Sequence, residues 1–219
     1  INLSIMAIRP FLSRQTTFIA RETNIPSINL QHSPYPKLFS MLYRRLYPRF
    51  DKVVCQSNDM KMDLVQNFKL SRQKTIVIHN PVDVNTIQKK AENTKPVLPA
   101  GVVNVVAAGK LKLQKGFDLL IQAFGKIHIP NVHLTILGDG PEHASLQRMI
   151  SELDLSQKVT MAGFQNNPFP YLKQADLFVL SSRFEGFPNI VLEAMACGTP
   201  VVAFDCRGGI SDIINDGVN

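Results

Sequence analysis

The chain has 219 residues, of which 45% are hydrophobic and 19% are charged, a balance typical of a globular protein with buried cores. No apolar run approaches the ~18 residues that a membrane-spanning helix needs, and the first residues lack the basic-then-apolar order of a signal peptide. The three cysteines, Cys55, Cys197 and Cys206, form no CxxC pair. They indicate neither a disulfide framework nor a zinc site, and a reducing, cytoplasmic location is expected.

The net charge of +7 is unevenly distributed along the chain. Residues 1–90 contain 14 of the 24 Lys and Arg and 5 of the 17 Asp and Glu, which gives +9, whereas residues 91–219 contain the other 10 and 12, which gives −2. Part of the basic excess lies in LYRRLYPRF, where Arg44, Arg45 and Arg49 alternate with apolar and aromatic residues. This pattern suits contact with the anionic inner face of a membrane or with a phosphorylated substrate. It is equally compatible with a helix that packs on the core and exposes a basic face to solvent. Nucleic acid binding is less expected, because no recognition motif accompanies the charge.

Strands and helices are predicted to alternate along the chain. The first part is expected to hold strands at 17–20, 52–55 and 76–78, a helix at 37–50, and a helix that Ser57 caps and that ends near Phe68. The polar residues 89–101, which include two prolines, are expected to form a linker. The second part is expected to hold strands at 102–108, 132–137, 177–180 and 201–204, helices at 118–127, 142–153 and 188–197, and a further helix before the final DGVN. This alternation predicts an α/β fold with two doubly wound, Rossmann-like parallel sheets, in domains at 1–88 and 102–219.

Two glutamates, Glu185 and Glu193, interrupt the otherwise apolar stretch SSRFEGFPNIVLEAMACGTPVVAFD. The stretch is predicted to form a loop, a helix and a strand, so that with the strand at 177–180 it completes a βαβ unit. The loop and helix N-terminus of such a unit lie at the carboxyl edge of the sheet, where ligands usually bind. Glu193 has mostly small helical neighbours, so it is compatible with a solvent-exposed face. It is also compatible with a carboxylate that accepts hydrogen bonds from the hydroxyls of a ligand.

Ligand-binding signals also follow two earlier strands. Gly109 precedes Lys110, Lys115 and a helix that begins near Phe117. A glycine turn, two lysines and a helix N-terminus suit a diphosphate, although the lysines are also compatible with ordinary surface charges. The next strand ends in ILGDGPE, a second glycine turn at the same edge. Neither the GxxxxGK[ST] of a nucleotide P-loop nor the GxGxxG of a dinucleotide-binding fold occurs.

Five segments together resemble the family 4 retaining glycosyltransferases (group 1 glycosyltransferases), which have the two-domain GT-B fold. They are VIHNPVD, GKLKLQKG, LGDGPE, RFEGFPNIVLEAMACGTPVVAFD and GGISDIINDG, and they occur in family order over residues 52–219. The resemblance implies transfer of a hexosyl or N-acetylhexosaminyl group from a nucleotide diphosphate-sugar, expected to be a UDP-sugar, with retention of configuration. The acceptor would be a glycan or a lipid-linked glycan. No D-x-D motif occurs, which fits an enzyme that needs no metal ion or other cofactor.

The resemblance also implies roles for individual residues. Glu185 would lie beside the donor sugar and Glu193 would bind the ribose hydroxyls. Lys110 and Lys115 would neutralise the diphosphate leaving group, so that the catalytic group comprises Glu185 and the two lysines. The other donor-binding residues would be Gly109, Gly138, Asp139, Gly163, Phe164, Gly186, Phe187, Pro188 and Asn189. Gly163 and Phe164 would lie near the nucleobase.

Two features depart from the family pattern. The first basic position is often arginine in the family, and Lys110 cannot make a bidentate phosphate contact, so Lys115 is expected to contribute more to donor affinity. Many members have a histidine near the donor sugar in the first domain, where this chain has ARETNIP. Glu22 and, less favoured, His32 are the candidates for this acceptor-side polar group.

The sequence lacks an initiator methionine and the glycine-rich loop that begins the first domain in the family. It is therefore expected to be an internal fragment that binds a donor but transfers sugar poorly or not at all. Two other functions remain open, namely a sugar-nucleotide binding module without turnover and a sugar-nucleotide epimerase of the same fold.

Overall fold

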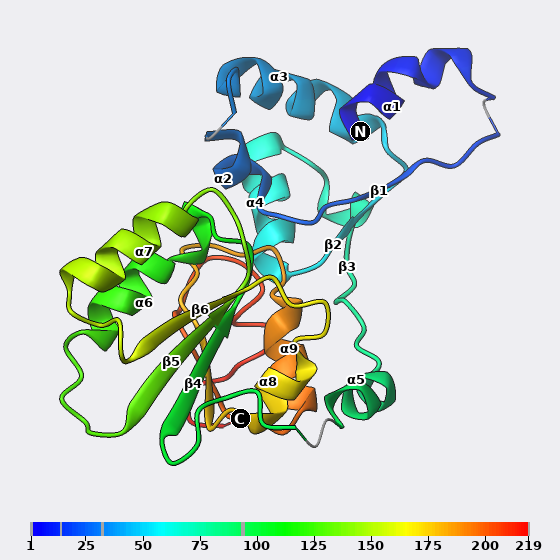
Figure 1. Cartoon of the computed structure of the whole chain (residues 1–219). Helices are drawn as coiled ribbons and strands as arrows, with labels where there is room; N and C mark the ends of the chain where they lie inside the picture. Colours follow the sequence, from blue (N-terminus) through cyan, green and yellow to red (C-terminus); the bar gives the residue numbers. More distant parts are fainter. Residues whose placement is uncertain (1, 14, 32, 93–94, 219) are drawn as a thin grey trace. The chain divides into compact units, whose positions relative to one another are not determined.

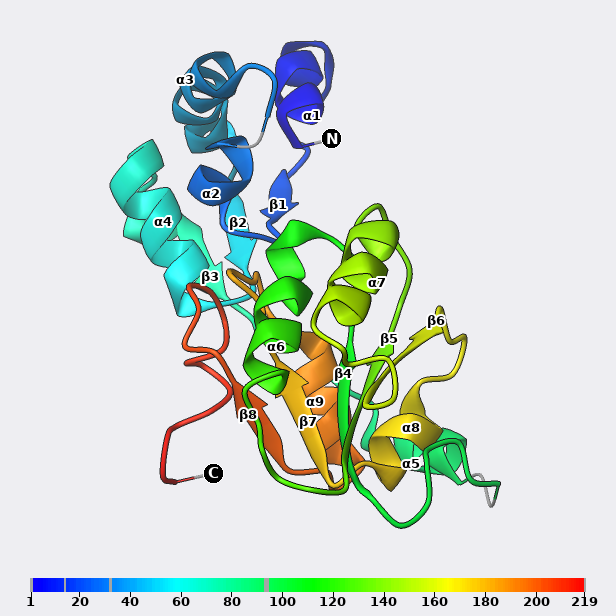
Figure 2. The same cartoon turned by 60° about the vertical axis from the view of Figure 1, so that its left-hand side comes forward.

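The computed structural model describes residues 2–13, 15–31, 33–92 and 95–218, which form two compact units (Figures 1 and 2). The first unit contains the described residues among 1–80, 185–187 and 207–218, and the second contains those among 81–184 and 188–206. Along the chain, the second unit thus begins at Pro81, ahead of the expected linker. The domain boundaries given above stay a prediction.

The first unit is built on a three-stranded parallel sheet with the order β1-β2-β3. Its strands are β1 (Ile19–Arg21), β2 (Lys52–Cys55) and β3 (Thr75–Val77), its helices are α1 (Asn2–Ile8), α2 (Pro26–Gln31), α3 (Pro36–Leu46) and α4 (Asn58–Phe68), and 3₁₀ turns lie at Arg9–Phe11, Tyr47–Arg49 and Arg72–Lys74. As predicted, α4 begins after Ser57, because the Ser57 hydroxyl accepts a hydrogen bond from the Met60 N–H (3.3 Å).

Aromatic residues in and after α3 fill the core of the first unit. Tyr47 and Phe50 are buried, and the rings of Tyr43 and Tyr47 stack with their centroids 4.3 Å apart. The three arginines of the same stretch are exposed, and the Arg44 Nε donates a hydrogen bond to the Asn67 carbonyl oxygen (3.1 Å). The aromatic residues of LYRRLYPRF therefore serve the core, and its basic residues face outward.

The second unit is a five-stranded parallel sheet with the order β6-β5-β4-β7-β8. Its strands are β4 (Val103–Ala108), β5 (Val132–Leu137), β6 (Val159–Gly163), β7 (Leu177–Leu180) and β8 (Val201–Ala203), and its helices are α5 (Val84–Ala91), α6 (Phe117–Phe124), α7 (His143–Glu152), α8 (Phe169–Gln174) and α9 (Asn189–Ala196). A 3₁₀ turn lies at Leu113–Lys115. Figure 1 shows α6 and α7 on one face of the sheet and α8 and α9 on the other, as a doubly wound fold requires.

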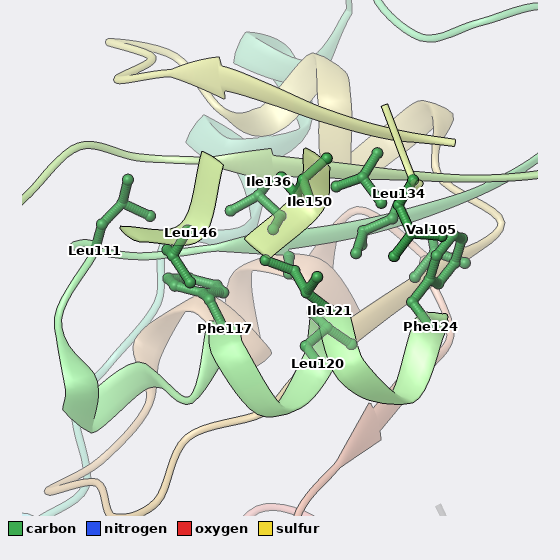
Figure 3. Packing of buried hydrophobic residues seen from close by; sticks show 13 residues of the cluster. Val105, Leu111, Phe117, Leu120, Ile121, Phe124, Leu134, Ile136, Leu146 and Ile150 are labelled. Atoms are coloured by element: carbon green, nitrogen blue, oxygen red, sulfur yellow. The ribbon is translucent and has the colours of Figure 1, made fainter. Parts of the chain in front are cut away.

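The core of the second unit lies between the α6/α7 pair and the sheet. Figure 3 shows Phe117, Ile121 and Phe124 of α6 pointing toward β4 and β5, where Leu134 and Ile136 meet them. The apolar residues of α6 recur every three or four positions, so they share one face of the helix. Ile121, Leu134 and Ile136 are almost entirely buried, and truncating such a residue to alanine costs about 2–5 kcal/mol.

One predicted helix needs correction, and the expected linker overlaps a helix at its start. The helix predicted before DGVN is absent. Residues 209–213 and 216–218 form turns instead, and Gly208 and Gly217, with φ values of +133° and +73°, depart from helical geometry on either side of the intervening residues. The start of the expected linker belongs to α5, which ends at Ala91 and packs against α8 and α9. In the described part of the chain, no helix is long and apolar enough to cross a membrane.

Candidate functional site

Glycine turns follow three neighbouring strands of the second unit, β4, β5 and β6. The Gly109 N–H donates to the Leu137 carbonyl oxygen (3.0 Å), and the Gly138 N–H donates to that of Gly163 (2.8 Å). A Cβ atom on Gly138 would overlap the carbonyl oxygen of Gly109. Glycine at this position therefore lets two turns approach at backbone contact, and the three turns form a floor at the carboxyl edge of the sheet.

A pocket of about 610 Å³ opens at this edge, within the usual range for small-molecule sites. Predicted site residues that line it are Gly109, Lys110, Gly138, Asp139 and Phe164. Phe164 is 70% exposed, so its aromatic ring is available to a flat ligand. The Asp139 carboxylate accepts a hydrogen bond from the N–H of the next residue (2.7 Å), which holds it in its own turn.

The two predicted lysines differ in their surroundings. Lys110 is exposed, whereas Lys115 is half-buried and its aliphatic chain lies against Gly109. A Cβ atom on Gly109 would come within 3.2 Å of the Lys115 Cε atom. Gly109 therefore leaves room for the Lys115 side chain beside a residue that lines the pocket.

The chain leaves β4 toward β5 and β6 on one side and returns to β7 and β8 on the other, so β4 and β7 flank the switch point of the sheet. The loops that follow these two strands are hydrogen-bonded to each other. The Arg183 N–H donates to the Gln114 carbonyl oxygen (2.8 Å), and the Gln114 side chain donates to that of Phe184 (3.0 Å). The Ser181 hydroxyl donates to the Lys115 carbonyl oxygen (2.9 Å). The loop that carries Lys115 is therefore fixed to the end of β7.

The side chain of Arg183 strengthens this link, a role that the sequence reasoning missed. Its guanidinium donates to both carboxylate oxygens of Asp118 at 2.7 Å and to the Leu113 carbonyl oxygen at 2.8 Å. These hydrogen bonds lower the pKa of Asp118. The available signal was an arginine two residues before Glu185 together with an aspartate in the first turn of the helix that follows the lysines.

Glu193 lies on α9, one turn after Ile190, which lines the pocket. Residues three apart share one side of a helix, so Glu193 belongs to the side of α9 that faces the pocket. Its side chain is half-buried and burial raises its pKa, while in the described part of the chain no cation pairs with it. Partial desolvation is not expected on an open face. Pro188 and Asn189 lie at the N-terminus of the same helix.

The other predicted loop residues, Glu185, Gly186 and Phe187, belong to the first unit. Glu185 is 6% exposed, and its N–H donates to the Arg207 carbonyl oxygen (3.0 Å). The structure therefore describes the two motif glutamates in different units. The eight-residue separation of the two glutamates in the sequence does not predict that they belong to different units.

Glu22 follows β1 in the first unit and is buried. Burial raises its pKa to about 7, although the Asn2 side chain donates a hydrogen bond to its Oε1 atom (3.2 Å). Burial and, secondarily, the Glu22 charge raise the pKa of Cys55 to about 12. His32, the other acceptor-side candidate, lies outside the described residues.

Comparison with known sequences gives two family matches. The family described as Glycosyl transferases group 1 matches residues 88–219, and that described as Glycosyltransferase Family 4 matches residues 12–86. One curated relative is a Campylobacter jejuni N-acetylgalactosamine-N,N'-diacetylbacillosaminyl-diphospho-undecaprenol 4-alpha-N-acetylgalactosaminyltransferase, 32% identical over 92% of this chain and 54% of the relative. Another is an uncharacterized glycosyltransferase of Methanocaldococcus jannaschii, 31% identical over 93% of this chain and 52% of the relative. The chain thus spans about half the length of the curated relatives it matches.

Among solved structures, Anabaena Alr3699/HepE in complex with UDP is similar to the chain. The two align with a TM-score of 0.85 and 26% identity, over 99% of this chain and 60% of that one. Together with the parallel sheets of both units, these matches show a partial GT-B fold.

Proposed function

Since the chain belongs to the group 1 glycosyltransferases, we propose that it takes part in moving a sugar from a nucleoside diphosphate-sugar to a glycan or lipid-linked acceptor. One observation carries the proposal, namely the pocket at the carboxyl edge of the second unit, floored by glycine turns and flanked by Lys110 and Lys115. A diphosphate needs such a combination of close backbone approach and positive charge.

UDP is the expected nucleotide. The exposed ring of Phe164 on the pocket wall suits stacking of a nucleobase, and Glu193 suits hydrogen bonds from the ribose hydroxyls. The likeness to Alr3699/HepE, which was solved with UDP, supports the same choice. The nucleoside and diphosphate would then occupy the pocket of the second unit.

In the proposed reaction, the acceptor hydroxyl oxygen bonds to the anomeric carbon of the donor sugar. The bond between that carbon and the β-phosphate oxygen breaks, its electron pair leaves on the phosphate, and the hydroxyl proton passes to the departing phosphate oxygen. The configuration is retained, as the resemblance implies. Charge grows on the phosphate during this step, so Lys110 and Lys115 stabilise the transition state more than the ground state and take the place of a metal ion. Glu185 lies beside the sugar in this scheme.

A lipid-linked acceptor is favoured, because the Campylobacter jejuni relative is named for a diphospho-undecaprenol-linked substrate. The outer side of α3 suits an anionic lipid surface. Arg45 and the apolar side chains of Leu38 and Met41 are exposed there, and Arg49 is exposed in the 3₁₀ turn that follows the helix. We therefore propose peripheral contact with the inner face of a membrane through this helix.

Saturation-transfer NMR with UDP-, GDP- and ADP-sugars tests the donor class. The proposal predicts that protons of the uracil and ribose of UDP-sugars receive saturation from the protein, and that excess UDP abolishes the signal. Stronger saturation of GDP- or ADP-sugars would contradict UDP as the nucleotide, and no saturation from any donor would contradict the proposed function.

A further inference from the structure

The segment Glu185–Phe187 is held in the first unit by two other stretches of backbone. A Cβ atom on Gly186 would overlap the carbonyl oxygen of Thr23, and one on Gly208 would overlap that of Glu185. The Glu185 N–H also donates a hydrogen bond to the carbonyl oxygen of Arg207, the residue before Gly208 (3.0 Å). The backbone of this segment is therefore in direct contact with the backbone at Thr23 and at Gly208. Gly186 itself has no side chain that could add further contacts.

The Phe187 ring, which also lies against Gly209, stacks on the imidazole of His79. The two rings stack with centroids 5.0 Å apart and planes inclined by 18°. The His79 Nε2 atom lies 3.4 Å from the Asp212 Oδ2 atom. Asp212 accepts hydrogen bonds from the N–H (2.7 Å) and the side-chain amide (3.0 Å) of Asn58, the first residue of α4. A chain of contacts thus leads from the start of α4 to Phe187.

We propose that His79 is a positioning residue of the transfer reaction, because its ring fixes Phe187 and thereby the position of Glu185 two residues earlier. Asp212 and Asn58 orient the imidazole for this contact. The inference rests on the proposed function, in which Glu185 lies beside the donor sugar. Errors of about 1 Å in the placement of a group at a reacting centre reduce rates by up to ~10²-fold, so the stack is expected to affect turnover.

A positioning role for His79 can be distinguished from a role in core packing by its effect on stability. The His79 side chain is 45% exposed, so its truncation removes the stack without opening a closed cavity. The residues predicted to contact the nucleobase, ribose and diphosphate, namely Phe164, Glu193, Lys110 and Lys115, belong to the second unit. Loss of His79 is therefore expected to lower kcat while it leaves UDP affinity and the melting temperature nearly unchanged.

The test uses the natural full-length protein and measures UDP release from UDP-glucose, UDP-galactose, UDP-N-acetylglucosamine and UDP-N-acetylgalactosamine, with water as the acceptor. The water oxygen bonds to the anomeric carbon, the bond to the β-phosphate oxygen breaks with its electron pair leaving on UDP, and a water proton passes to solvent. The fastest donor is then used to compare wild type with His79→Ala, His79→Phe and a matched control, His128→Ala, whose side chain is exposed on the loop between α6 and β5. UDP affinity is measured for each variant by calorimetry.

His79→Ala is expected to lower kcat on the order of 10-fold, with the donor KM and the Kd for UDP within about twofold of wild type. His79→Phe keeps a ring on Phe187 and is expected to recover most of kcat, and His128→Ala matches wild type. An unchanged kcat in His79→Ala, an equal loss of UDP affinity, or no recovery in His79→Phe would overturn the inference. A wild-type protein that neither binds UDP nor releases it from any donor would overturn the proposed function itself, which is a distinguishable result.

Discussion

Arg183 and Asp118 are joined by two parallel hydrogen bonds, each 2.7 Å long, between the terminal nitrogens of the guanidinium and the two carboxylate oxygens. Arg183 follows β7 and Asp118 lies in the first turn of α6, so the pair connects the loops on either side of the switch point. The loop between β4 and α6 carries Lys115. The pair therefore fixes the loop that carries Lys115, a residue predicted to bind the diphosphate.

Replacing Arg183 by alanine is expected to weaken UDP binding roughly 10-fold, because the loop that carries Lys115 loses the hydrogen bonds of the guanidinium to Asp118 and Leu113. Arg183→Lys is expected to fall between alanine and wild type, since an ammonium cannot make the paired contact with a carboxylate. Titration calorimetry with UDP checks both variants. Arg148→Ala, on the exposed side of α7, is the control. Equal UDP affinity in wild type and Arg183→Ala would show that the pair does not position Lys115.

Local signals were sufficient for the longer elements of the fold. The strands predicted at 132–137 and 177–180 coincide with β5 and β7, and α4 follows its predicted Ser57 cap. The unpredicted β6 lies at the edge of the sheet, where most of its residues are half-buried or exposed, so the sequence there has no clear apolar period. Helix α8 has six residues, too few to display a helical period.

The site shows the same limit at longer range. The glycine turns and lysines were readable because each follows its own strand, and the carboxyl ends of parallel strands share one edge. The pairing of Arg183 with Asp118 joins residues 65 positions apart, and the placement of Glu185 in the first unit depends on contacts with residues much earlier in the chain. Local sequence pattern does not encode such long-range contacts. The family resemblance therefore predicted the ligand-binding residues but not the residues that hold them in place.

Glu22 is expected to make stability fall as the pH rises. Its pKa is raised from 4.5 to about 7 in the folded protein, so between these values the folded state keeps a proton that the unfolded state releases. The free energy of unfolding therefore decreases as the pH rises through this window, by at most about 3 kcal/mol. Glu22→Gln mimics the protonated group and should match wild type near pH 4.5 but melt at a higher temperature near pH 8. Melting curves at both pH values decide, with the exposed Glu152→Gln as control. If the wild-type melting temperature does not fall relative to that of Glu22→Gln between pH 4.5 and pH 8, the raised pKa of Glu22 is contradicted.

The two motif glutamates are expected to affect different kinetic constants in the natural full-length protein. Glu193→Ala should mainly raise the donor KM, because ribose hydrogen bonds are present equally in the ground and transition states. Glu185→Ala should mainly lower kcat, by roughly 10²-fold or more, if its carboxylate acts on the reacting sugar. Initial-rate kinetics over a range of UDP-sugar concentrations separate the two effects. The assignment of roles is wrong if both variants change the same constant.

Membrane contact through α3 predicts a salt-dependent interaction. Co-sedimentation with vesicles that contain anionic lipid should decrease sharply between about 0.05 M and about 0.15 M salt, because screening weakens surface attraction. The double variant Arg45→Glu/Arg49→Glu should lose most binding at low salt. Lys126→Glu/Arg148→Glu makes the same change of charge at exposed positions of the second unit and should retain it. Salt-independent binding, or equal binding by both variants, would argue against α3 as the contact surface.

Titration of UDP into this chain tests most directly whether the second unit holds a nucleoside diphosphate. Wild type should bind UDP saturably, and Lys115→Ala should weaken binding on the order of 10-fold by removing the half-buried cation beside Gly109. Glu193→Gln should weaken it by about 10- to 100-fold, because a charge-assisted hydrogen bond contributes about 1.5–3 kcal/mol. Lys126→Ala, on an exposed residue after the end of α6, should bind as wild type does, and melting curves exclude unfolding of each variant. Absence of saturable binding in wild type, or the same affinity in all four proteins, would contradict a nucleotide site at the carboxyl edge of this sheet.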